Sequence, residues 1–151
     1  MITYKSEFHL QDIKGTYIFI YFVDETYYAT TGIGLGALDG EGAFFVNGRK
    51  VLYEKLKAEK PKLGTIVPVR HNNMNILLLI AKDIFINSVD KTLIREMFKM
   101  ILKTYSKNRN DIVFKIVANV SDYDNVSHIL ENIDDKLQTK NIHFNFELYG
   151  R

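Results

Sequence analysis

The sequence contains no cysteine and no tryptophan in 151 residues, and its four histidines are scattered. A chain without cysteine cannot form disulfides, zinc–thiolate sites or a thiolate nucleophile, and it suits a reducing cytoplasm, where we expect this protein. The histidines show neither HxH nor HExxH spacing, so we expect no bound metal and no resident cofactor. These absences narrow the possible chemistry without naming a function.

Strong charge and long apolar runs are also missing. The net charge is +2 at pH 7, which is too small to indicate binding to nucleic acid or to an anionic membrane. The longest apolar runs, residues 17–23 and 76–81, are far shorter than a membrane-spanning helix requires. We therefore expect neither a membrane nor a nucleic acid as a partner.

The sequence does have ample material for a core. Its hydrophobic fraction is 46%, and it contains ten phenylalanines and nine tyrosines. The length suits one domain of ordinary size, and no linker, repeat or low-complexity segment divides the chain. We predict a single domain over residues 1–151.

Apolar residues follow two periods that indicate strands alternating with helices. Residues 17–23 and 75–81 are continuous apolar runs, typical of strands covered on both faces, whereas apolar residues repeat at helical spacing over 93–105. Pro68, in the short segment 65–69, points to an edge strand. The alternation predicts an α/β fold with a mixed, mostly parallel sheet of about six strands and helices on both faces. The expected strands are 2–10, 17–23, 65–69, 75–81, 111–120 and 143–149, and the expected helices are 49–60, 93–105 and 126–137.

Polar residues mark the starts of the last two expected helices. Ser88 or Asp90 is placed to cap the second helix. Ser121 and Asp124 have the spacing of a capping box before the third. We interpret Ser121 and Asp122 first as capping residues, with contact to a ligand as the alternative.

A glycine-rich run is the most informative local feature. Six of the nine glycines fall between Gly32 and Gly48, after an expected strand and before an expected helix. Amide N–H groups can converge on an anion at such a place. The run lacks G-x-G-x-x-G spacing and no Gly-Lys-Ser/Thr follows, so it is neither a dinucleotide fingerprint nor a P-loop. A plain connecting loop, with Asp39 and Gly40 in a turn, remains the alternative.

Within that run, residues 35–40 read Leu-Gly-Ala-Leu-Asp-Gly and are followed by Gly48. This pattern resembles the first phosphate loop of macro domains, the ADP-ribose-binding fold, whose members carry Gly-Gly-Gly-Val-Asp-Gly. The expected order of elements is also similar to the macro-domain order across nearly all of the chain. The resemblance implies a macro-domain-like fold that binds ADP-ribose or a related nucleotide. Glu7 stands where the family carboxylate holds the adenine amino group, and Asp12 is a rival for that place.

Two segments depart from the family pattern. Asp24 and the three residues after it stand where the family has Asn-Ala-Ala-Asn, and residues 121–125 contain no glycine where a second phosphate loop is expected. Whether the chain is an ADP-ribosyl hydrolase is therefore left open, and the sequence favours no hydrolase activity. If hydrolysis occurs, Asp24 or Asp39 would be the candidates to orient the attacking water. No catalytic residue is assigned. The candidate ligand-binding residues are Glu7, Asp24, Gly32, Gly34, Gly36, Leu38, Asp39, Gly40, Ser121 and Tyr123.

The sequence also allows a function without a nucleotide. The chain could be a non-enzymatic interaction protein, for example a phage accessory factor, that keeps the fold and has lost the pocket. An acidic rim made by Asp24, Glu25, Asp122 and Asp124 would then contact a host or partner protein. Fold alone does not decide between the two readings.

Overall fold

The computed structural model describes residues 1–5, 16–25, 48–71, 74–83, 89–118 and 122–150. Within these ranges, six strands and three α-helices alternate in the predicted order, with a short 3₁₀ turn after the second helix. The strands are β1 (Ile2–Lys5), β2 (Thr16–Asp24), β3 (Ile66–His71), β4 (Met74–Lys82), β5 (Ile112–Ala118) and β6 (Asn145–Gly150); the helices are α3 (Gly48–Glu59), α4 (Lys91–Thr104) and α5 (Tyr123–Thr139), and the 3₁₀ turn is Ser106–Asn108.

The strands form one sheet in the order β1-β6-β5-β2-β4-β3. Four of its strand pairs are parallel, and only β3 runs antiparallel to its neighbour β4. Strand β3 lies at an edge, which suits Pro68 because proline has no amide hydrogen for a second neighbour. The predicted mixed, mostly parallel sheet is confirmed.

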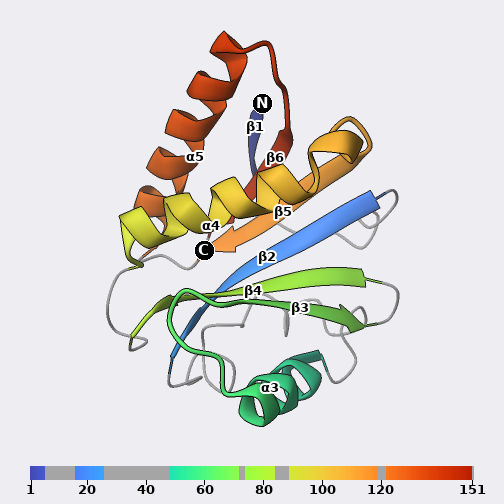
Figure 1. The fold of residues 1–151 in the computed structure, drawn as a ribbon, viewed down its shortest axis with the longest axis vertical. Coiled ribbons are helices and arrows are strands. Elements are labelled where there is room, and N and C mark those ends of the chain that lie inside the picture. The colour runs from blue at the N-terminus through green and yellow to red at the C-terminus, as the bar shows by residue number, and fades with distance from the viewer. Residues whose placement is uncertain (6–15, 26–47, 72–73, 84–88, 119–121, 151) are drawn as a thin grey trace.

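Helices cover both faces of this sheet (Figure 1). Helix α3 packs on one face, where Leu52 and Leu56 meet the apolar side chains of β2, β3 and β4. Helices α4 and α5 pack on the opposite face against alternate residues of β2, β4, β5 and β6. Because β2 is inside the sheet and covered on both sides, its sequence has to be continuously apolar.

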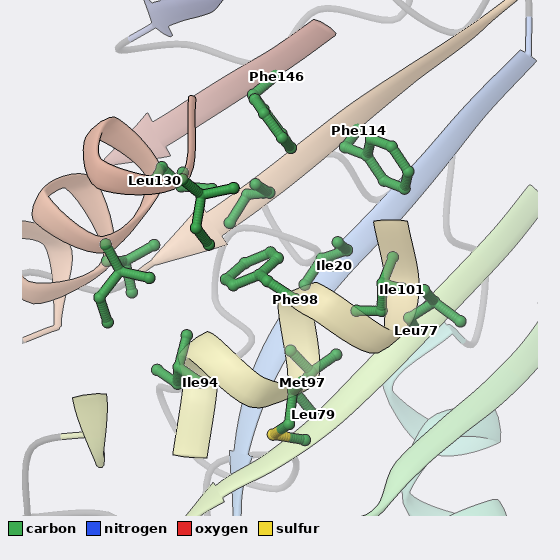
Figure 2. Close-up of a cluster of buried hydrophobic side chains, with 14 of the residues drawn as sticks. Ile20, Leu77, Leu79, Ile94, Met97, Phe98, Ile101, Phe114, Leu130 and Phe146 are labelled. Atoms are coloured by element: carbon green, nitrogen blue, oxygen red, sulfur yellow. The ribbon is translucent and has the colours of Figure 1, made fainter. Parts of the chain in front are cut away.

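The larger core lies between the sheet and helices α4 and α5 (Figure 2). The Phe98 side chain is fully buried there and meets the Phe22 ring edge-on, with the ring centroids 6.3 Å apart. Phe114 of β5 lies 5.9 Å from Phe146 of β6, centroid to centroid. Such aromatic pairs add packing energy beyond the area that they bury, so the first pair fixes α4 against β2 and the second fixes β5 against β6.

Several boundaries differ from the prediction in informative ways. The first strand is described only to Lys5; residues 6–10 of the expected strand lie outside the described part. Of the two predicted caps of α4, Asp90 is the N-cap residue: its Oδ1 accepts a hydrogen bond from the Leu93 amide at 3.0 Å. None of the described helices is long and apolar enough to cross a membrane.

Truncating Phe98 to alanine should lower the free energy of unfolding by about 3–5 kcal/mol, because the cavity left in a packed core cannot fully collapse. Urea denaturation followed by circular dichroism would measure this. Met100 on the same helix is 63% exposed, so Met100→Ala is the matched control and should change stability by about 0.5 kcal/mol or less. Equal losses for the two variants would contradict the packing described here.

Candidate functional site

The carboxyl ends of the parallel strands share one edge of the sheet, called here the carboxyl edge. The last residues of β1, β2, β4 and β5 are Lys5, Asp24, Lys82 and Ala118. Strands β2 and β5 are neighbours there, but the next helices after them, α3 and α5, pack on opposite faces. In open α/β sheets, a reversal of this kind marks the crevice between two strand ends where ligands bind. The ends of β2 and β5, called here the β2/β5 crevice, are therefore the candidate site.

A buried ion pair lies at this edge. The Lys82 ammonium donates a hydrogen bond to Asp122 Oδ2 at 2.8 Å, and the two side chains are only 1% and 2% exposed. Lys82 ends β4 and Asp122 precedes α5, so the pair links two elements on either side of β2. Removing two charges from water is costly unless they satisfy each other, which makes this pair a defining feature of the edge.

Asp122 also holds the backbone that leads into α4. Its Oδ1 accepts a hydrogen bond from the Val89 amide at 3.1 Å. Asp122 occupies the N-cap position of α5, yet its side chain makes no capping hydrogen bond. Asp122 is thus the predicted N-cap residue by position, but its carboxylate oxygens accept from Lys82 and Val89 and not from amides of the helix.

Asp24 ends β2 and is fully buried. The register of β2 against β4 shifts between Val23 and Asp24, and such irregularities often re-aim a side chain beside a site. The next residue, Glu25, stays attached to β4 through its amide, which donates to the Lys82 carbonyl at 2.9 Å. The Glu25 carboxylate is on the surface and accepts a hydrogen bond from the Leu63 amide at 2.5 Å.

These positions correct the predicted acidic rim. Asp24 and Asp122 are buried, and Asp122 is matched by Lys82, so neither presents a free carboxylate to a partner protein. Glu25 and Asp124 remain on the surface. A rim of four exposed acids does not exist.

The structure brings two of the predicted ligand residues to the candidate site. Asp24 lies at the end of β2, and Tyr123 begins α5. Tyr123 is partly buried and packs against the larger core, so part of its ring already serves packing. The other predicted residues lie outside the described part of the chain: Glu7, Gly32, Gly34, Gly36, Leu38, Asp39, Gly40 and Ser121, together with the rival Asp12.

Sequence reasoning missed Lys82. The available signal was a lysine directly after the apolar run 75–81, that is, at the end of a buried strand where a charge needs a partner. Nothing in the sequence indicated that the partner lies forty residues away at Asp122.

A second polar cluster lies on the sheet itself. The Lys115 ammonium donates to Glu147 Oε1 at 2.8 Å and to the Tyr149 hydroxyl at 3.0 Å, and it sits 4.4 Å from the centre of the Tyr17 ring. Burial raises the pKa of Glu147, but the hydrogen bonds from Lys115 and Tyr149 and the charges of Lys115 and Lys5 outweigh it, leaving the pKa below its usual value. The cluster ties β1, β2, β5 and β6 together. Among the described residues, no group of three or more histidines and acids could hold a metal ion.

Solved structures resemble this chain, although no protein-family model and no curated protein matches its sequence. The macrodomain of Mycobacterium tuberculosis DarG is 13% identical, with a TM-score of 0.65 over 99% of this chain and 97% of its own. A macrodomain protein from Streptomyces coelicolor is 12% identical, with a TM-score of 0.65 over 100% and 99%. This chain has the macrodomain fold. Thermosipho africanus DarTG, solved in complex with ADP-ribose, is 10% identical with a TM-score of 0.55, over 89% of this chain and 38% of that one.

The macrodomain likeness confirms the fold that the glycine run and the order of elements suggested. It covers nearly the whole length of the chain. At 10–13% identity the likeness establishes architecture, and the residues of the site have to be argued from their own chemistry.

Replacing Lys82 with methionine should lower the free energy of unfolding by about 3–5 kcal/mol, because Asp122 keeps a buried charge without its cation. Adding Asp122→Asn should restore part of the loss, since the amide oxygen still accepts from Val89 and the charge is gone.

The matched control is Lys99→Met, which breaks the exposed ion pair with Glu96 and should cost less than about 1 kcal/mol. Urea unfolding of the three variants and of the natural chain measures all of these changes in stability. If Lys82→Met and Lys99→Met lost the same stability, the buried pair would not be the organising contact of this edge.

Proposed function

We propose that this protein binds ADP-ribose, or a closely related nucleotide diphosphate, in the β2/β5 crevice. The observation that carries the proposal is the reversal at this crevice, where α3 and α5 diverge to opposite faces and buried polar groups gather at the strand ends. The macrodomain fold supports it, since the T. africanus neighbour was solved with ADP-ribose.

Charge at the crevice is compatible with an anionic ligand. The sequence departs from the family pattern by having acids, Asp24 and Asp122, near the expected place of a diphosphate. An unpaired carboxylate there would repel the diphosphate. Asp122 is compensated by Lys82 at 2.8 Å, and Asp24 is buried. The diphosphate itself would be held by amides of residues 32–42 and by helix N-termini, which favour anions.

The buried Lys82–Asp122 pair gives no support to a second function in hydrolysis. The two side chains satisfy each other's charge and are only 1% and 2% exposed, so we assign the pair a structural role at the carboxyl edge.

An interaction protein without a ligand is less favoured, because two of the four acids that its surface would use, Asp24 and Asp122, are buried.

Adding ADP-ribose at one hundred times its Kd should stabilise the protein by about 2.7 kcal/mol, visible as a rise of several degrees in Tm. Gly40→Val should abolish this rise with little change in the Tm of the free protein, because a valine side chain would obstruct the backbone approach to the diphosphate. Met100→Ala is the control and should bind as the natural chain does. No shift at millimolar ADP-ribose would refute the proposed function.

A further inference from the structure

Helix α4 and the turn after it concentrate positive charge. Residues 91–109 contain six lysines and arginines and one acid, although the whole chain has a net charge of only +2. The rest of the chain is therefore net negative, and the small total conceals a strong separation of charge. A local patch of this kind, rather than the total, decides whether a polyanion can bind.

The cations follow one ridge of the helix. Lys91, Arg95, Lys99 and Lys103 are spaced four residues apart, so successive side chains are neighbours on the helix surface. The row extends about 18 Å along the helix axis at 1.5 Å per residue. The three lysines are exposed, while the opposite side of α4 is buried in the core.

Little neutralises this row within the described part of the chain. Lys99 pairs with Glu96 at 3.2 Å, and no ion pair joins the row to the acids of the neighbouring helix α5. Like charges four residues apart destabilise a helix, whereas an ordinary solvated face alternates their signs. The row of like charges therefore lowers the stability of the helix by itself. Its presence suggests a partner that binds these cations.

We propose that the outer face of α4 binds duplex nucleic acid through its phosphate backbone. A duplex presents a regular row of negative charges along each strand, which complements a straight row of cations. The face has no exposed aromatic ring to stack on unpaired bases, as single-strand binding would need. An anionic membrane fits poorly, since the apolar side of α4 is buried and cannot enter a bilayer. Helix α4 lies along the outside of the sheet, where a partner can reach it (Figure 1). Its cations would contact phosphates and not base edges, so binding should be independent of base sequence.

The test is fluorescence anisotropy of a labelled 20-base-pair duplex with the full chain, titrated with salt from 50 mM upward. With about four cations engaged, log K should fall with log salt with a slope of about −4. Lys99→Gln combined with Lys103→Gln should weaken binding at least tenfold at 50 mM salt and reduce the slope by about two.

The matched control is Lys136→Gln with Lys140→Gln, which has the same spacing and charge change on exposed positions of α5 and its end. Both double variants should keep the Tm of the natural chain. No binding of the duplex at 50 mM salt, an equal loss in the control pair, or tighter binding to vesicles of anionic lipid would each overturn the proposal. Because none of these readouts involves ADP-ribose, they are independent of the proposed function.

Discussion

The burial of β2 on both faces is the constraint from which the rest of the structure follows. This strand pairs with β4 on one side and β5 on the other, and its alternate side chains enter the two separate cores. A strand in that position has no face in contact with solvent, so polar residues can occur only at its ends. Asp24 is the residue where the apolar run stops, and it stops at the crevice where the chain diverges to the two faces.

The buried pair of Lys82 and Asp122 lies near the same end of β2. The two elements that flank the end of β2 have to be held at a defined separation, and an ion pair of 2.8 Å sheltered from water does this directionally where apolar packing would not. The second carboxylate oxygen of Asp122 adds the amide of Val89, so one side chain positions the entries to both α4 and α5. A polar centre of this kind adds specificity to the edge.

The architecture was readable from the sequence because periodicity reports burial. The continuous run at 17–23, the helical spacing of 93–105 and Pro68 in a short strand each correspond to an observed environment. Long-range pairing was not readable: Lys82 and Asp122 are far apart in sequence, and the local capping pattern around Asp122 pointed to a different partner. The net charge of +2 gave no sign of the row of cations on α4, because it is a sum over the whole chain. For the candidate site, the sequence predicted the strand ends and the family resemblance indicated a ligand. The contacts among the site residues could be found only from the structure.

The edge position of Pro68 has a consequence for assembly. Parallel-rich sheets tend to recruit further strands wherever an unpaired ladder of amides faces outward. At β3 the ladder is interrupted by a residue with no hydrogen to donate. Extension of the sheet from molecule to molecule is thereby disfavoured at the β3 border.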